Sequence, residues 1–411
     1  MLAQWFRGGG RVAGIDRRST LGRKASTRVG GPPQTVAEGQ EPQQRRCWRA
    51  LLGLLAIVAP SAHADETGGI SRLRVPQGHA IEVYATGVSN ARQMALLPSG
   101  ALLVGSRDAG VVTAVLPGAA LAERRVLTLL SGLEMPTGIA VHGGDLYIAD
   151  ISRIYRVANV EARIAELARG GPRVKPELVN DRLPADTHHG WRYLRIDEQG
   201  RLIVPIGAPC NVCDRDADGY AQIVRMQPDG SQREVLARGV RNSVGFAVEP
   251  GTGHLWFTDN GRDWLGDDLP SCELNRLTEV GQHFGFPFCH EGAVPDPKYG
   301  RGRACSEFVA PVAKLGPHVA PLGITFWGGD AVVALHGSWN RSRKSGYKVV
   351  RVVLDRKPSG SLVQRVDDLV TGWLQGEYAW GRPADVLAMP DGSLLIADDK
   401  QGLIYRLSGR L

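Results

Sequence analysis

The sequence predicts an all-β fold, a six-bladed β-propeller, from three observations. One phrase recurs six times after about residue 92: an apolar strand, a turn ending in Gly, a second apolar strand, a polar stop and a third strand. Each copy forms a small antiparallel sheet that cannot bury its faces alone, so neighbouring copies must pack together. Helical patterns are scarce, and residues 161–168 give the best short candidate.

The turn glycines and the strands after them define the blades in chain order. The turns end at Gly100, Gly144, Gly200, Gly253, Gly329 and Gly392. The second strands follow at 101–106, 145–150, 201–207, 254–260, 331–337 and 393–399. The third strands include 111–116, 153–157, 221–226, 347–354 and 403–407, with 273–277 fitting more loosely. Six copies therefore predict six blades.

Residues 1–64 account for the net charge of the chain. They contain ten Lys and Arg against three Asp and Glu, which equals the formal charge of +7, and residues 65–411 carry 39 of each sign. The basic part is expected to be removed, so the charge balance gives no reason to expect a nucleic-acid partner.

A secretory signal is predicted at the end of this leader. Three arginines within 45–49 precede an apolar run at 50–59, and Ala-His-Ala at 62–64 matches a cleavage site. The run is too short to span a bilayer. We expect a disordered leader and signal over 1–64 and a propeller over 65–411, periplasmic or secreted, with no stable membrane span. The choice between Sec and twin-arginine export stays open, as does the true start codon.

Five cysteines follow the signal, and an oxidising compartment favours disulfides. We expect a local Cys210–Cys213 bridge and a Cys289–Cys305 bridge, with Cys272 free. An Asp follows the C-x-x-C pair where c-type haem attachment requires His, so no haem is expected.

Polar residues collect at one end of the predicted axis, because the innermost strands begin on the face where the second strands end. The innermost strands begin near Gln93, Thr137, His188, His189, Arg241, Asn242, His318 and Arg382. The second strands end near Arg107, Asp150, 210–213, 259–262, 336–341 and 398–400. Arginines suit a planar polyanionic ligand, and a histidine beside them suits a general base.

Several segments resemble the soluble quinoprotein sugar dehydrogenases, especially the sorbosone dehydrogenase-like and pyranose dehydrogenase branch. They are PIGAPCNVC (205–213), GVRNSVGFAVEP (239–250), HLWFTDNGRDWLGDD (254–268), HGSWNRSRKSGYKVVRV (336–352) and WGRPADVLAMPDGSLLIADD (380–399). The resemblance covers the chain from about residue 70 to its end. It implies a six-bladed propeller that holds pyrroloquinoline quinone over Ca²⁺, oxidises a sugar and passes electrons to an external acceptor, a quinone or a cytochrome.

The resemblance also implies catalytic residues. His189, in an H-x-x-R context with Arg192, matches the catalytic base, and His188 is the competing assignment. Arg241 and Asn242 match the pair that contacts the quinone, with Arg241 also stabilising developing negative charge.

Cofactor ligands are implied in the same way. Gly261 and Arg262 match positions whose backbone carbonyls bind Ca²⁺. Arg382 matches an arginine that binds a quinone carboxylate, and Arg341 is expected to bind another.

Trp339 and Trp380 are expected to flank the cofactor or the sugar, and Thr137 stands where the glucose-oxidising branch has a glutamine. Cys272 replaces an acidic residue, so the sugar remains open.

Two other functions compete with this interpretation. A Ca²⁺-dependent lactone hydrolase on the same fold would need an acidic cage, to which Asp150, Asp259 and Asn260 are the candidates. A non-catalytic propeller would only present its rim to a partner. The D-x-D-x-D-G segment 214–219 begins like a calcium loop, but its twelfth position is Arg225, so a solvated acidic turn is the better interpretation. His318 and His336 are more simply explained as structural. No dinucleotide fingerprint or G-x-S-x-G motif supports a nucleotide cofactor or a serine hydrolase.

Overall fold

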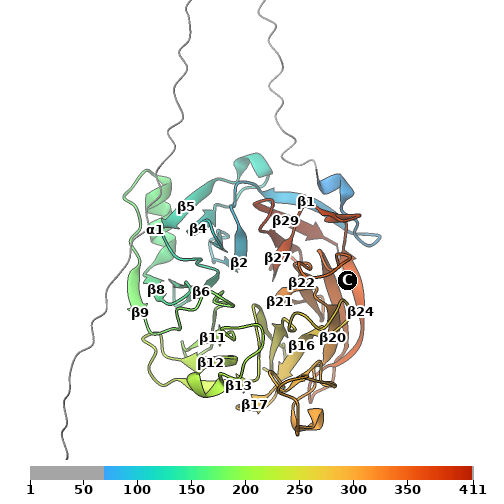
Figure 1. Cartoon of the computed structure of the whole chain (residues 1–411). Helices are drawn as coiled ribbons and strands as arrows, with labels where there is room; N and C mark the ends of the chain where they lie inside the picture. Colours follow the sequence, from blue (N-terminus) through green and yellow to red (C-terminus); the bar gives the residue numbers. More distant parts are fainter. Residues whose placement is uncertain (1–68, 410–411) are drawn as a thin grey trace, which may run out of the picture. The chain divides into compact units, whose positions relative to one another are not determined.

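Each predicted repeat folds as an antiparallel sheet, because its apolar segments are short and are separated by tight turns. The computed structural model describes residues 69–409, and in this part of the chain six sheets stand around a central axis (Figure 1). The all-β class and the six blades are confirmed. The predicted leader and signal peptide over 1–64 lie outside the described residues.

The blades follow one another in chain order. The first three consist of β2 (Ala91–Leu96), β3 (Leu102–Ser106), β4 (Val111–Val115) and β5 (Val126–Ser131); β6 (Gly138–His142), β7 (Asp145–Ala149), β8 (Ile154–Val157) and β9 (Glu177–Asn180); and β10 (Arg195–Ile196), β11 (Leu202–Ile206), β12 (Gln222–Met226) and β13 (Glu234–Arg238). The last three consist of β14 (Phe246–Val248), β15 (Leu255–Asp259), β16 (Ser271–Leu277) and β20 (Ala313–Pro317); β21 (Pro321–Trp327), β22 (Asp330–Leu335), β23 (Lys348–Asp355) and β24 (Leu362–Val370); and β27 (Pro383–Ala388), β28 (Leu394–Asp398), β29 (Leu403–Ser408) and β1 (Ala80–Ala85).

Short elements decorate the blades. They are β17 (Gln282–His283), which pairs parallel with β13; the hairpins β18 (Cys289–His290) with β19 (Val294–Pro295) and β25 (Leu374–Gln375) with β26 (Tyr378–Ala379); the helix α1 (Val160–Ala168); and the 3₁₀ turns η1 (Ile70–Arg72), η2 (Leu121–Glu123), η3 (Asp216–Asp218) and η4 (Cys305–Glu307).

The ring is closed by its first strand. β1 pairs antiparallel with β29, from Ala80 opposite Ser408 to Ala85 opposite Ile404, so the sixth blade contains both ends of the propeller. This pairing covers the edge of β29 that would otherwise be exposed. It also ties the two ends of the ring together, so each blade packs against two neighbours.

The repeat signature is explained by its turns and its core. Gly100 and Gly329 have φ of 85° and 104°, a backbone region that favours glycine, and the four other turn glycines also have positive φ. The helix expected at 161–168 forms as α1, whose Val160 and Ile164 are buried in the apolar cluster between the first and second blades.

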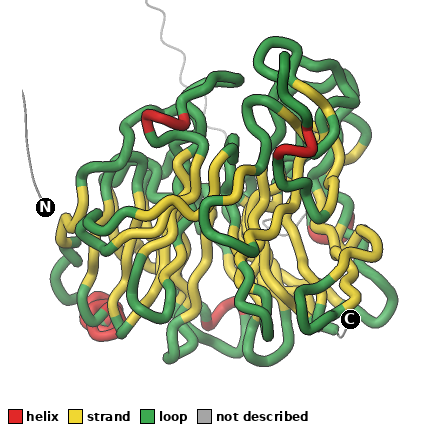
Figure 2. Tube along the Cα trace, turned by 90° about the horizontal axis from the view of Figure 1, so that it is seen from below, coloured by secondary structure: helices red, strands yellow, loops and turns green. Residues whose placement is uncertain are grey.

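Both predicted disulfides form, and Cys272 is free and buried. The Cys210–Cys213 bridge closes the loop after β11, and the Cys289–Cys305 bridge fastens an excursion between β16 and β20. Loops and short strands extend well beyond the strand layer on one face of the ring (Figure 2). Within residues 69–409 no helix has the length and apolar character needed to cross a membrane.

Candidate active site

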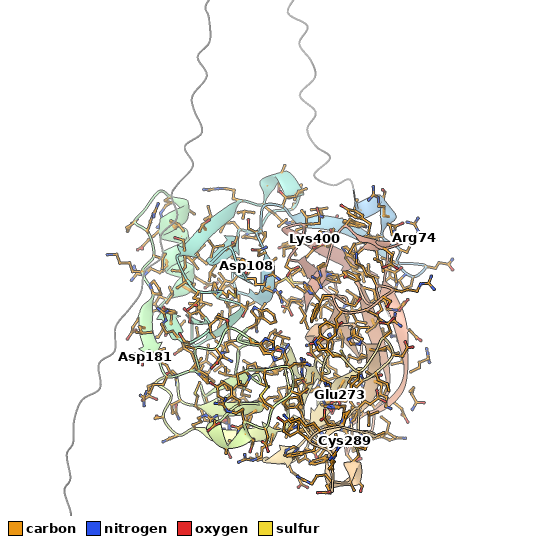
Figure 3. All side chains as sticks on the ribbon, viewed as in Figure 1. Arg74, Asp108, Asp181, Glu273, Cys289 and Lys400 are labelled. Carbon is orange, nitrogen blue, oxygen red and sulfur yellow. A yellow bond between two sulfur atoms is a disulfide. The ribbon has the colours of Figure 1, made fainter. Side chains whose placement is uncertain are left out.

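The axis opens, on the face where the innermost strands begin, into a cavity of about 620 Å³. Its walls come from all six blades, whose side chains surround the centre of the ring (Figure 3). The predicted residues that the cavity brings together are His188, His189, Arg241, Asn242, Trp339 and Arg382, with the backbone of Gly261. The repeats therefore gather residues nearly 200 positions apart around one space.

His189 is held as a neutral imidazole. Its Nδ1 lies 2.8 Å from the Ala208 carbonyl oxygen, an acceptor, so Nδ1 carries the proton and Nε2 keeps a lone pair. Burial lowers the pKa of His189 well below its usual value, and the charges of Arg241 and His188 lower it further. Gly207 lets the backbone pass close to His189, since a Cβ there would lie 2.6 Å from the His189 carbonyl oxygen and 2.7 Å from its Cβ. The imidazole is thus fixed, uncharged and able to accept a proton.

His188 is the more exposed of the two histidines. The ring centroids lie 4.1 Å apart with a 55° tilt. The pKa of His188 is lowered by burial and by Arg241, while Asp263 raises it. The geometry favours His189 over His188 as a base, because His189 has the fixed tautomer.

Arg241 uses all five of its N–H donors inside the protein. Nε donates to the Asn211 carbonyl oxygen at 2.9 Å, and Nη2 donates to Asn211 Oδ1 at 2.9 Å and to Asp263 at 3.2 Å. Nη1 donates to the carbonyl oxygens of Asn260 and Gly261 at 3.1 and 2.9 Å. A guanidinium has five such donors, so Arg241 presents a fixed positive charge and a planar face rather than free N–H groups.

The carboxylate of Asp259 fixes the strand start that carries Arg241 and Asn242. It accepts their backbone N–H groups at 2.8 and 2.6 Å. The Asn260 side-chain amide adds bonds to the carbonyl oxygens of Asn242 and Pro321 at 3.0 and 3.1 Å. Asp259 and Asn260, candidates for an acidic metal cage, therefore act here as clamps between strands.

Three buried polar atoms of cavity-lining residues have no hydrogen-bond partner among the described residues. They are Asn242 Oδ1, an acceptor, and the donors Trp191 Nε1 and Arg92 Nε. An unpaired buried polar group costs about 1–3 kcal/mol. A ligand with complementary polar groups would remove this cost, so these atoms favour an occupant of the cavity. Trp191 stands in the HHGWR segment, beside residues that the sequence did single out.

The opposite wall holds a second group of arginines. Arg92 Nη2 lies 2.9 Å from Asp399, and its buried Nε has no partner in the described part of the chain. Arg382 donates to the carbonyl oxygens of His336 and Gly337 at 3.0 and 2.7 Å. Arg107 also lines this wall, paired with the exposed Asp108 at 2.6 Å. The wall therefore offers an anion both charge and N–H donors that the protein does not use.

The sequence interpretation missed Arg92 and singled out its neighbour Gln93. The register between β2 and β3 shifts between Ala91 and Met94, and such a bulge changes the direction in which side chains point. The Gln93 side chain instead joins three blades, donating to the Leu194 carbonyl oxygen and accepting from the N–H groups of Ile139 and Leu194. The motif alone carried no signal of the bulge.

Other predicted residues lie outside the cavity lining. The Thr137 hydroxyl is bonded to the Arg192 backbone at 2.7 and 3.0 Å, and the Arg262 side chain pairs with Asp296 at 2.5 Å. Arg341 donates to the Asp267 carbonyl oxygen at 2.9 Å and to Asp268 at 2.8 Å.

Trp380 packs in the core beside Trp373 and donates to the Gly372 carbonyl oxygen at 2.7 Å. His318 and His336, which the sequence analysis explains as structural, both border the cavity with one ring nitrogen in a hydrogen bond. His318 Nε2 lies 2.8 Å from the Gly266 carbonyl oxygen, and His336 Nε2 lies 2.9 Å from Asp399.

The calcium-like segment 214–219 is an acidic turn with paired carboxylates. Asp216 bonds to Arg238 at 2.5 Å and to Gln222 at 2.8 Å, and Asp218 bonds to Arg215 at 2.5 Å. Within residues 69–409 no group of three or more His, Cys, Asp and Glu side chains is arranged to hold a metal ion.

Fold and cavity together define a class: a six-bladed propeller with an arginine-lined axial site beside a neutral histidine. The chain belongs to the TrAA12-like family, whose model matches residues 73–410. This assignment confirms the resemblance to the soluble quinoprotein sugar dehydrogenases.

Individual proteins are similar to this chain over different lengths. An uncharacterised protein of Borreliella burgdorferi is 32% identical over 355 residues, covering 82% of this chain and 91% of that protein. A pyrroloquinoline quinone-dependent pyranose dehydrogenase of Coprinopsis cinerea is 34% identical over 125 residues, 25% of this chain and 17% of that protein. The holo form of the pyranose dehydrogenase PQQ domain from Coprinopsis cinerea superposes with a TM-score of 0.70 at 21% identity, covering 82% of this chain and 97% of that chain. The structural match supports the fold.

Proposed function

We propose that this chain is an exported oxidoreductase that uses pyrroloquinoline quinone and Ca²⁺ to oxidise an aldose, a sugar aldehyde or a related sugar, with a sorbosone dehydrogenase-like specificity. The observation that carries the proposal is the pairing, in one cavity, of a neutral base with a wall of arginines. The family assignment and the similarity to the pyrroloquinoline quinone-dependent pyranose dehydrogenase of Coprinopsis cinerea support it.

The cavity residues fit the quinone. Pyrroloquinoline quinone is a planar tricarboxylate, and carboxylates pair well with guanidinium groups that have free donors. Arg92, Arg107 and Arg382 would bind these carboxylates. The unpartnered Asn242 Oδ1 and Trp191 Nε1 suit a ligand with both a ring N–H and oxygen acceptors.

The calcium proposal rests on backbone oxygens. The carbonyls of Gly261 and Arg262 would hold the ion. The Gly261 carbonyl accepts one bond from Arg241 and has two lone pairs, so one remains for a cation. The arrangement is compatible with Ca²⁺, and the nearby guanidinium charge would make its binding sensitive to Arg241.

His189 and Arg241 have separate roles in the proposed reaction. His189 Nε2 takes the proton of the substrate hydroxyl, and the bond from Nδ1 to Ala208 keeps the ring oriented while it does so. Arg241 contributes positive charge beside the site without moving, because all its donors are engaged. When bound, the quinone would supply a two-electron acceptor and Ca²⁺ a Lewis acid beside it, and an external quinone or cytochrome would be the final electron acceptor.

Two disulfides in the propeller suit an oxidising compartment and so support export to the periplasm or the medium. The lactone hydrolase alternative loses support because its candidate ligands do not form a cage at the axis. Neither Asp150 nor Asp259 lines the axial cavity, and Asp259 and Asn260 clamp strands.

The test is reconstitution of the mature protein with pyrroloquinoline quinone and Ca²⁺, followed by dye reduction over a panel of sugars. We expect quinone-dependent reduction with at least one aldose and its loss on chelation. Absence of quinone binding would refute the proposal and favour the non-catalytic propeller. Hydrolysis of lactones that requires Ca²⁺ but not the quinone would establish the hydrolase instead.

A further inference from the structure

The large exposed aromatic side chains of residues 69–409 gather around one opening. Trp264, Trp339 and Tyr378 are 66%, 69% and 64% exposed. Trp339 lines the axial cavity, and Tyr378 lines a side pocket of about 440 Å³ that shares Arg107 and Arg382 with it. Large apolar rings exposed together beside a cavity are typical of a ligand-binding surface.

The two tryptophans form a corner. Their ring centroids lie 5.7 Å apart and their planes meet at 86°, so one indole forms a floor and the other a wall. The face of an indole carries partial negative charge, and it attracts the weakly positive C–H groups on the apolar face of a pyranose ring. The corner therefore suits a sugar ring that stacks on one indole and abuts the other.

Hydrogen bonds hold this corner in place. Arg341 and the Ser342 N–H bond to Asp267, at 2.9 and 3.0 Å, and so tie the loop of Trp339 to the loop of Trp264. The Asn340 amide donates to Asp263 at 3.2 Å, and Asp263 also accepts from Arg241 in the cavity wall. Trp264 itself has a φ of 67°, a conformation that bulky residues rarely adopt and that persists only when its surroundings impose it.

We propose that Trp264 and Trp339 form a subsite for the second pyranose ring of a reducing oligosaccharide, whose first ring reacts beside His189. This inference rests on the proposed function. The cavity must hold the cofactor and the reacting ring, whereas Trp264 does not line it and lies against Trp339 at its edge. A chain of two or more sugars would therefore pass from the cavity onto the tryptophan corner.

The kinetic test compares glucose with cellobiose and maltose in the reconstituted holoenzyme, using a dye as acceptor. We expect a higher kcat/KM for at least one disaccharide than for glucose. Trp264→Ala should reduce the ratio of kcat/KM for the disaccharide to kcat/KM for glucose about five- to tenfold, which corresponds to the loss of one stacking contact. Trp264→Phe should retain most of this ratio. Leu178→Ala, which removes another exposed apolar side chain (51% exposed) from β9, is the matched control and should keep the wild-type ratio. An unchanged ratio in Trp264→Ala, or a change only in the rate with different electron acceptors, would overturn the subsite.

A binding measurement separates this inference from the proposed function. Cellobiitol and maltitol have no reducing end, and their binding to the quinone-free protein can be followed by tryptophan fluorescence. We expect saturable quenching of the fluorescence. The dissociation constant for the alditol should rise in Trp264→Ala and return most of the way to the wild-type value in Trp264→Phe. Quenching of this kind without any quinone-dependent sugar oxidation would refute the proposed function and leave the subsite standing. Sugar oxidation with no difference in alditol binding between wild type and Trp264→Ala would refute the subsite and leave the function standing.

Discussion

The two sides of the axial cavity hold their arginines in opposite ways. On one side, Arg241 donates all five of its N–H groups to the surrounding backbone and side chains. On the other side, Arg382 donates to two carbonyl oxygens, and Arg92 has one ion pair and a buried Nε without a partner in the described residues. The same residue type is part of the scaffold on one side and available to a ligand on the other.

This difference separates stability from binding. When a guanidinium whose donors are all engaged is truncated, the protein loses much stability, because the buried acceptors become unpaired. When a guanidinium with free donors is truncated, the empty protein loses less stability, but the complex loses affinity because the ligand would use those donors. The first side should therefore determine folding and the orientation of the base, and the second side should determine affinity for an anion.

The largest effect on activity is expected at His189, which lies on the side of the cavity that carries Arg241. His189→Gln should reduce kcat about a thousandfold, as for loss of a general base, while quinone binding persists. The measurements are steady-state dye reduction and titration with the quinone. His188→Gln is the matched control and should retain much more activity. If His188→Gln were inactive and His189→Gln active, the base would be the neighbouring residue.

Arg241 should dominate the stability of the empty protein. Arg241→Ala should lower the free energy of unfolding by about 3 kcal/mol. It leaves the carbonyl oxygens of Asn211, Asn260 and Gly261 without this donor and the Asp263 carboxylate without its counter-charge. Arg382→Ala should lower the same quantity by only about 1–2 kcal/mol, because it leaves two carbonyl oxygens rather than five acceptors without their donor. Chemical denaturation of the quinone-free variants provides the measurement. Equal losses in the two variants would contradict the division between the two sides.

Arg382 should instead govern cofactor affinity. Arg382→Ala should raise the dissociation constant of pyrroloquinoline quinone about ten- to a hundredfold, since charge-assisted bonds to a carboxylate are worth about 1.5–3 kcal/mol. Arg382→Lys should recover part of the loss, because it keeps the charge but not the fork of donors. Calorimetric titration of the quinone distinguishes the three proteins. An unchanged dissociation constant in Arg382→Ala would place the carboxylates elsewhere.

The sequence predicts the repeating parts of this molecule well. Blade number, second strands, turn glycines and α1 follow from local periodicity, and all are present in the structure. The two expected disulfides also form, although the sequence alone does not determine how the cysteines pair. The gathering of His189, Arg241 and Arg382 also follows, because each stands at the same point of its own repeat.

The irregular parts could not be predicted in the same way. Arg92 lines the cavity in place of Gln93 because of a bulge in β2, and no residue type in that strand predicts the bulge. Arg341 stands in a motif expected to bind a carboxylate ligand, yet its side chain bonds to Asp267 and Asp268 in a distant loop. Donor saturation at Arg241 likewise depends on Asn211 and Asp263, which are 30 and 22 residues away. These outcomes depend on how loops meet, and loop geometry is not periodic.

The smallest expected effect is on the pH dependence of stability, and it involves His336 on the side of the cavity that carries Arg92 and Arg382. Burial lowers the pKa of His336 to about 4, even though Asp399 opposes the shift. The unfolded chain binds the proton near pH 6.5 and the folded protein does not, so this residue makes stability fall as pH drops from 6.5 toward 4. His336→Gln should remove about 2 kcal/mol of that dependence, measured as the free energy of unfolding at pH 7 and pH 4.5. The exposed His142→Gln is the control and should retain the wild-type slope. A slope equal to wild type in His336→Gln would show that other groups on this wall take up the proton, and the arginines there would then be less fixed than the structure indicates.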